Sequence, residues 1–180
     1  MKKTALTIAL TALVINLSAQ KLSTRSGKVK FFSDAKIENI EAVNKQVSSV
    51  MDLASGKFAF LVPIRGFVFE KALMQEHFNE NYLESDQYPN ATFKGRIANT
   101  EAIKLNKNGE YQLKLKGKMK MHGVENPFSE EVTLTVKDEQ VHLHSQFYLK
   151  ASDYQVEIPA GKKDNINNRL EVTVNIDYDK

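Results

Sequence analysis

The chain of 180 residues contains no cysteine and no tryptophan. Without a thiol it can form no disulfide, use no thiol nucleophile, bind no zinc through cysteine and carry no lipid on an amino-terminal cysteine. The fold must therefore be held together by burial of apolar side chains, and about 160 residues suffice for such a core.

A strong excess of charge of either sign is also missing, since 25 basic residues stand against 22 acidic ones. We expect residues 1–19 to be a secretory signal peptide, because Lys2 and Lys3 precede an apolar run at residues 5–17 and Leu17-Ser18-Ala19 has the form of a cleavage site. Its removal takes two lysines and no acids, so 23 basic residues would face 22 acidic ones. Such a balance does not fit a general nucleic-acid-binding protein.

Long apolar runs are absent after this first one, which is itself too short to span a bilayer. Residues 20–180 are most economically one domain. With the signal peptide, this predicts a periplasmic or secreted location.

The clearest pattern in the chain is a strand at residues 111–121. Its odd positions are apolar or glycine and its even positions are mostly lysine, so one face is apolar and the other is charged. At about 3.3 Å per residue the strand is long enough for the wall of a tilted barrel. Gly117, Met119 and Met121 on the apolar face indicate either an irregular core or the wall of a cavity for a flexible ligand.

The same alternation, with turn residues between the runs, predicts further strands. We expect them at residues 28–33, 57–64 with a continuation at 67–69, from 91 toward 105, 132–136, 141–149 and 170–178. Residues 37–50 are ambiguous, because Ile37, Ile40 and Val43 fit a helical spacing, whereas Ile40, Ala42, Val47 and Ser49 fit a strand imperfectly.

Turns, loops and one helix complete the pattern. Tight turns are expected at Asn108-Gly109, His122-Gly123 and residues 137–140. Residues 70–82 show helical spacing, and residues 85–90 and 159–168 have the composition of loops. The chain therefore predicts an all-β fold, an antiparallel barrel of about eight strands with one short helix. A two-sheet sandwich is the alternative.

Several motifs resemble the YceI-like (polyisoprenoid-binding) family. They are Phe78-Asn79-Glu80-Asn81-Tyr82-Leu83, Tyr88-Pro89-Asn90-Ala91-Thr92-Phe93 followed by Gly95, Leu115-Lys116-Gly117 through His122-Gly123-Val124 with Pro127 after it, Asp153-Tyr154-Gln155-Val156, and the closing strand. The likeness covers about residues 70–177. The amino-terminal part departs, because the family's glycine-punctuated hairpin is here reduced to residues 55–60 and Gly66.

This resemblance implies an extended, lipocalin-like barrel that holds a long isoprenoid or acyl chain in its interior, in a family for which no catalysis is established. The side chains expected to face inward and contact such a ligand are Phe58, Phe60, Val62, Phe93, Tyr111, Leu113, Leu115, Met119, Met121, Leu143 and Phe147. The same set also fits an ordinary filled core, since an eight-stranded barrel is just wide enough either to fill with side chains or to hold one ligand.

The polar side chains give less support for a binding site than the apolar set does. Lys114, Lys116, Lys118 and Lys120 point away from the cavity and are expected to be solvated. A headgroup would sit at the barrel mouth, near His122 or the loop that bears Lys162 and Lys163. His142 and His144 share the outer face of a strand, which favours surface histidines over a metal site. His77 and His122 carry no signal of their own.

Catalytic sets are not found in the sequence. No nucleophile motif, phosphate-binding loop or His-Glu-x-x-His sequence is present. Glu130 and Glu131 are adjacent, so on a strand they face opposite ways and cannot share a substrate. We therefore expect no enzyme activity, no cofactor and no metal.

Four functions remain open on the sequence: a carrier of a long apolar chain, a filled barrel that serves only as an interaction module, a histidine-dependent enzyme and a small outer-membrane barrel. The mean hydropathy of −0.40 and the missing tryptophan disfavour the last. The expected partner is a long isoprenoid or acyl lipid, with transient contact to a membrane surface and no nucleic acid. The oligomeric state is not fixed, and a dimer is compatible with the sequence.

Overall fold

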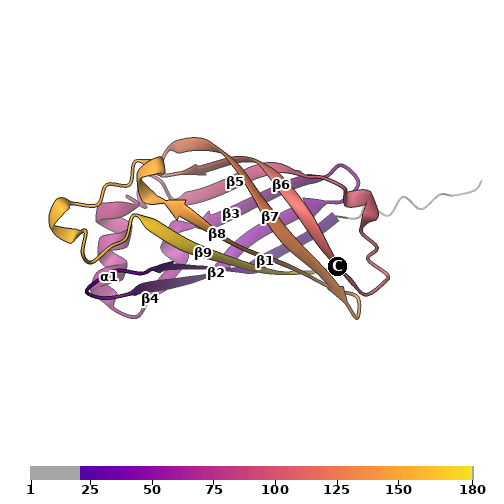
Figure 1. The fold of residues 1–180 in the computed structure, drawn as a ribbon, viewed down its shortest axis with the longest axis horizontal. Coiled ribbons are helices and arrows are strands. Elements are labelled where there is room, and N and C mark those ends of the chain that lie inside the picture. Colours follow the sequence, from indigo (N-terminus) through magenta and orange to yellow (C-terminus); the bar gives the residue numbers. More distant parts are fainter. Residues whose placement is uncertain (1–20, 180) are drawn as a thin grey trace, which may run out of the picture.

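The computed structural model describes residues 21–179, an elongated antiparallel β-barrel with its strands running along the length of the molecule (Figure 1). The predicted signal peptide lies outside the described residues. The strands are β1 (Lys21–Ser33), β2 (Ile40–Asp52), β3 (Lys57–Pro63), β4 (Phe67–Phe69), β5 (Asn90–Ile97), β6 (Gly109–Met121), β7 (Val124–Lys137), β8 (Gln140–Lys150) and β9 (Arg169–Tyr178).

The barrel is closed. Its strand order is β1-β9-β8-β7-β6-β5-β3-β2, and β2 pairs again with β1. This confirms the eight-stranded barrel and excludes the two-sheet sandwich. The short β4 pairs with β2 and follows β3 after a 3-10 turn at Ile64–Gly66, as the predicted continuation at residues 67–69 requires.

The first two strands differ most from the prediction. β1 begins at Lys21 rather than at residue 28, and residues 40–52 form a strand, not a helix. The β1–β2 register shifts between Thr24 and Val29, and each strand there exposes two consecutive residues. Such bulges interrupt the period of two. In addition, β2 places polar Asn44 and Ser49 in the interior, where they are fully buried, so no apolar alternation was visible.

Two of the three predicted turns are confirmed. His122 and Gly123 have φ of 49° and 77°, and Asp138 and Glu139 have φ of 48° and 66°. Both pairs connect strands directly, at Met121↔Val124 and Lys137↔Gln140. Two positive φ values are what a tight hairpin turn requires. β7 consequently starts at Val124, well before the expected residue 132.

The Asn108-Gly109 turn was predicted wrongly. β5 ends at Ile97, and a longer connection with a 3-10 turn at Thr100–Ala102 leads to β6. The Asn108 side chain instead accepts a hydrogen bond from the backbone N–H of Asp138, with an N···O distance of 2.8 Å. The side chain therefore stabilises the neighbouring β7–β8 turn.

The predicted helix is confirmed in position. It comprises α1 (Ala72–His77) and a following π-helical turn (Phe78–Tyr82). Met74, Phe78 and Tyr82 pack on the core, whereas Leu73 is 60% exposed. The helix lies at one end of the barrel, together with segment 151–168, which contains two 3-10 turns (Ala151–Tyr154 and Ala160–Lys162) (Figure 1). We call this the mouth end and the other the closed end. None of the helices in residues 21–179 is long and apolar enough to cross a bilayer.

The closed end is filled with side chains. Met51, Leu134 and Ile176 are completely buried there. Tyr178 joins them, with its hydroxyl 2.8 Å from that of Ser49. The packed core thus occupies one end of the barrel and leaves the other end for a cavity.

Candidate ligand cavity

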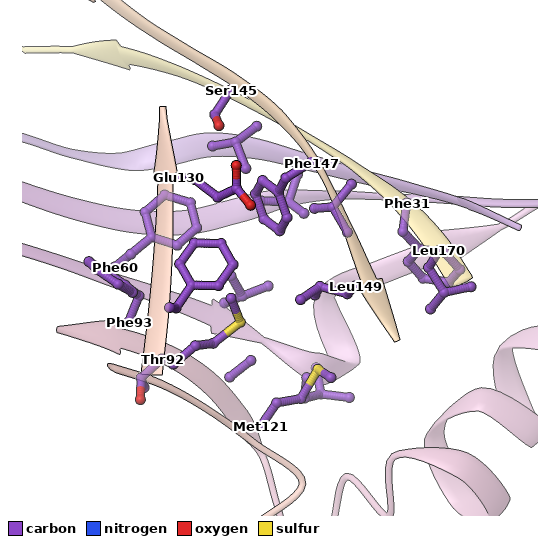
Figure 2. Close-up of a pocket in the computed structure, with 18 of the residues that line it drawn as sticks. Phe31, Phe60, Thr92, Phe93, Met121, Glu130, Ser145, Phe147, Leu149 and Leu170 are labelled. Atoms are coloured by element: carbon purple, nitrogen blue, oxygen red, sulfur yellow. The ribbon is translucent and has the colours of Figure 1, made fainter. Parts of the chain in front are cut away.

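A cavity of about 170 Å³ lies inside the barrel toward the mouth end (Figure 2). Side chains from all eight strands of the ring except β2 line it, and nearly all of them are apolar. The lining residues are Val29, Phe31, Phe58, Phe60, Val62, Ile64, Phe67, Phe78, Leu83, Ala91, Thr92, Phe93, Leu115, Met119, Met121, Phe128, Glu130, Val132, Leu143, Ser145, Phe147, Leu149, Ala151, Val156, Leu170, Val172 and Val174.

The residues predicted to contact a ligand line this cavity, except for Tyr111 and Leu113. Leu113 is buried in the packed core. Tyr111 lies near the closed end, where its hydroxyl accepts a hydrogen bond from the backbone N–H of Lys104 at 3.1 Å. Alternation along a strand predicts which face a side chain occupies, but not where along the barrel the filling stops. Contact of the lining residues with a ligand stays a prediction.

An aromatic cluster at the cavity's mouth side was missed. The ring of Phe31 lies 5.3 Å from that of Phe67 and 5.5 Å from that of Phe78, measured between centroids. These rings come from β1, β4 and the π-helical turn, three elements with no common sequence pattern. Their apolar positions were visible, but their convergence depends on how β3 and β4 bend over the barrel end.

At Gly117, where the sequence indicated an irregular core or a cavity wall, the space left by the missing side chain is filled. The ring of Phe93 covers this position on the inner face, and it covers the paired Gly95 as well. The methionines behave as expected, because Met119 and Met121 both line the cavity and their unbranched side chains can adapt to its shape.

A second apolar cleft of about 340 Å³ adjoins the cavity at the mouth end. The two share lining residues from β1, β9, the π-helical turn with the residue that follows it, and segment 151–168, namely Phe31, Phe78, Leu83, Ala151, Val156 and Leu170. Cavity and cleft together reach the roughly 300–1,000 Å³ that is typical of ligand sites. The shared side chains therefore separate an apolar cleft beneath α1 from the cavity inside the barrel.

A polar pocket adjoins the cavity and the cleft at Val156. Its lining includes His122 and Lys163, both expected near a headgroup, whereas Lys162 lines the apolar cleft. Lys36 and Glu84 also line the polar pocket. Since charges of both signs are present, this pocket shows no preference for an anion.

His122 connects three segments at the mouth. Its Nδ1 lies 3.1 Å from the backbone oxygen of Tyr154, and its Nε2 lies 2.8 Å from a carboxylate oxygen of Glu84. The ring of Tyr88 packs edge-on against it at 4.8 Å between centroids. The sequence indicated a turn and a place near a headgroup for His122, but not these contacts, because its partners are distant in the chain.

The outer face of β6 is solvated, as predicted. Lys114, Lys116, Lys118 and Lys120 are all exposed. Lys118 pairs with Glu125 at 2.8 Å, and this hydrogen bond raises the pKa of the lysine. The charges on this strand therefore lie outside the cavity.

The other histidine candidates also lie on the outer face. His142 Nδ1 is 2.7 Å from Asp177 and His144 Nδ1 is 2.9 Å from Asn175, both across the β8–β9 pairing. Within residues 21–179 no three His, Asp or Glu side chains are grouped so that they could hold a metal ion. Glu130 and Glu131 do face opposite ways, since Glu130 lines the cavity and Glu131 is exposed.

Comparison with known proteins adds a family match. The family model described as the YceI-like domain matches residues 11–178. Among proteins with curated descriptions, no match to this sequence was found.

Solved structures show the same fold at low sequence identity. A polyisoprenoid binding domain from Saccharophagus degradans, implicated in plant cell wall breakdown, has a TM-score of 0.77 at 14% identity, covering 88% of this chain and 97% of that one. BcnA of Burkholderia cenocepacia has a TM-score of 0.69 at 16% identity, covering 86% and 96%. The YCEI protein of Campylobacter jejuni has a TM-score of 0.60 at 16% identity, covering 100% and 99%.

Proposed function

This chain belongs to the YceI-like family, and we propose that it is a periplasmic or secreted binding protein that encloses a long apolar chain in its barrel. Binding would serve transport, storage or sequestration of the ligand, without catalysis. The ligand class we propose is an isoprenoid or acyl lipid. The description of the Saccharophagus degradans domain as polyisoprenoid-binding supports this class.

The observation that carries the proposal is the apolar cavity in the barrel, which shares six lining residues with the apolar cleft at the mouth end. Transfer of a methylene group from water into such a site contributes about 0.8 kcal/mol, so ten buried methylenes contribute about 8 kcal/mol before other terms. The loss of translational and conformational freedom offsets several kcal/mol of this. Micromolar or tighter binding therefore needs no polar contact.

The location of the mouth fits transient contact with a membrane surface. Exposed apolar side chains, Ile37 (69% exposed) and Leu73 (60% exposed), occur at this end beside Lys36 and Lys71. A ligand taken from a bilayer would enter through the cleft under α1. This route keeps the chain away from water.

Extraction and reloading test the proposal. Organic extraction of the purified protein followed by mass spectrometry should yield a lipid in stoichiometric amount, and the delipidated protein should take up an added long-chain isoprenoid. Ala91→Phe places a ring in the cavity and should reduce uptake at least tenfold. Ala59→Phe is the matched control, since Ala59 is exposed on the outer face of the neighbouring β3. A clean extract with no uptake of added lipid would contradict the proposal.

A further inference from the structure

The barrel wall has a side window between β7 and β8. The two strands pair only from Thr133↔His144 to Lys137↔Gln140, and toward the mouth end they diverge (Figure 1). Where the ladder ends, the Ser145 hydroxyl donates a hydrogen bond to the backbone oxygen of Glu131 at 3.2 Å. Nearer the mouth, the Asn126 side-chain N–H donates to the backbone oxygen of Asp153 at 2.7 Å.

Aromatic side chains occupy this window. The rings of Phe128 on β7 and Phe147 on β8 are 5.0 Å apart between centroids and meet edge to face. Both line the cavity, yet both are only half-buried. Packing of side chains, and not backbone hydrogen bonds, therefore closes the wall here.

Glu130 stands at the window and faces inward. It alternates with Phe128 and Val132 on the inner face of β7, and it is half-buried. Figure 2 shows its carboxylate among the side chains of the cavity, in the same view as Ser145 and Phe147 of β8. Among the residues that the structure describes, it is the one ionisable side chain that lines the cavity.

The carboxylate of Glu130 has no partner within residues 21–179, neither a hydrogen-bond donor nor a cation. The lysines nearest to it in sequence register, Lys114 and Lys116 on β6, are on the outer face. It is energetically unfavourable for a carboxylate to lose its hydrating water to an apolar ligand without gaining a hydrogen-bond donor or a cation. A ligand that fills the cavity must therefore either leave Glu130 hydrated or supply it with a donor.

We propose that Glu130 is the residue that selects the polar group of the bound chain, and that it favours a group that donates hydrogen bonds, an ammonium or a hydroxyl, over an anion. Ser145 supports the same chemistry. Its hydroxyl already donates its proton to the backbone oxygen of Glu131, so toward the cavity the hydroxyl can only accept hydrogen bonds. Both polar groups at this place accept, and a carboxylate or phosphate would meet repulsion.

This inference rests on the proposed function, because it requires a chain in the cavity. Its test compares three ligands with the same saturated chain: hexadecylamine, hexadecanol and hexadecanoate. Their dissociation constants at neutral pH are measured below the concentrations at which each ligand aggregates, for the full chain and for Glu130→Gln. The native protein should bind the amine most tightly and the carboxylate most weakly.

Glu130→Gln keeps the shape and an acceptor oxygen but removes the charge. We expect the affinity for the amine to fall about tenfold, as for loss of one hydrogen bond to a charged group. The alcohol should change by less than about threefold and so report that the cavity is intact, while the carboxylate should gain. Glu131→Gln, on the outer face, should leave all three affinities unchanged.

The outcomes separate this inference from the proposed function. If all three ligands bind equally to the native protein and to Glu130→Gln, chain binding stands and the role of Glu130 is overturned. If the native protein prefers the carboxylate, the role is overturned as well. If none of the three binds and added isoprenoid is also not taken up, both the proposed function and this inference are wrong.

Discussion

The ring of Phe93 lies against Gly117 of the neighbouring strand, and a Cβ at Gly117 would come within 2.7 Å of Phe93 Cζ. The same Cβ would lie 2.3 Å from the backbone oxygen of Lys94. Gly95, paired with Gly117, is equally crowded, with Phe93 Cζ at 2.5 Å from its Cβ position. Two glycines opposite each other thus let an aromatic ring lie flat on the barrel wall.

Gly117→Ala should destabilise the protein, because the added methyl group meets backbone and ring at distances that no Cβ tolerates. We expect the free energy of unfolding to fall by about 1–3 kcal/mol, the usual range for overpacking. Urea unfolding followed by circular dichroism measures it. Gly161→Ala is the control, since nothing lies within 4 Å of a Cβ there. Equal stability of the two variants would contradict the crowding.

Leu134→Ala and Leu115→Ala should separate stability from binding. Leu134 is completely buried in the packed closed end, so its truncation should cost about 2–5 kcal/mol. Leu115 lines the cavity and already lacks neighbours on one side, so its truncation should cost less and should change the affinity for long chains. Thermal unfolding and lipid uptake, measured on both variants, give the comparison. A larger loss of stability for Leu115→Ala than for Leu134→Ala would contradict this prediction.

Alkaline pH should destabilise the protein through Tyr178. Burial raises the pKa of this tyrosine above its ordinary value of 10, against a smaller opposing effect of its hydrogen bond to Ser49. The folded state therefore keeps a proton that the unfolded chain loses above pH ~10. Below that pH the free energy of unfolding does not change through Tyr178. Above it, the free energy of unfolding should fall by about 1.4 kcal/mol per pH unit.

Tyr178→Phe should remove this part of the alkaline slope. At neutral pH it should cost about 1–3 kcal/mol, because the buried hydroxyl of Ser49 loses its partner. Tyr148→Phe, at an exposed position, is the control and should keep the slope of the native protein. Urea unfolding at several pH values from neutral to alkaline distinguishes the two. If the free energy of unfolding depended on pH in the same way in both variants, Tyr178 would not be the cause of the alkaline loss of stability.

His122→Ala should loosen the mouth. The ring contacts with Tyr154 and Glu84 hold segment 151–168 and the start of the 84–88 loop against the β6–β7 turn. Without them, amide hydrogen exchange at Gln155 and Val156 should accelerate several-fold, and a bound lipid should dissociate faster. The free energy of unfolding should fall by about 1–2 kcal/mol.

The backbone of His122 needs its own control, because its φ of 49° is unfavourable for most residues. His122→Asn retains tolerance of this conformation while shortening the side chain. If the asparagine variant exchanges as slowly as the native protein, the backbone conformation and not the ring contacts stabilises the mouth.

The second half of the barrel could be predicted from the sequence because its strands obey simple rules. β6, the end of β7, β8 and β9 largely alternate, and two of their turns contain residues that tolerate positive φ, His122 with Gly123 in one and Asp138 in the other. β1 and β2 could not be predicted as well. Their bulges shift the phase of the alternation, and the buried Asn44 side chain donates a hydrogen bond to the backbone oxygen of Pro63, a partner that only the fold provides.

The sequence predicted which side chains face the barrel interior, but not the extent of the cavity. Inward positions such as Phe58, Phe147 and Met119 follow from alternation. The point along the barrel where the packed core ends and the cavity begins depends on how the Met51, Leu134 and Ile176 side chains pack together. Alternation along a strand does not predict this packing. Glu130 was visible only as one of two adjacent acids, because its importance arises from the separation of β7 and β8.

The pairing of β1 with β9 has a consequence for how the chain folds. Residues 28–32 find their partners at residues 171–175, so the ring closes through contacts between the two ends of the sequence. Contacts that distant in sequence slow folding, because a long loop must close before they form. A chain still lacking β9 would present β1 and β8 as open edges, and exposed edges promote association between chains. The closing step should therefore set both the folding rate and the interval during which the protein is prone to aggregate.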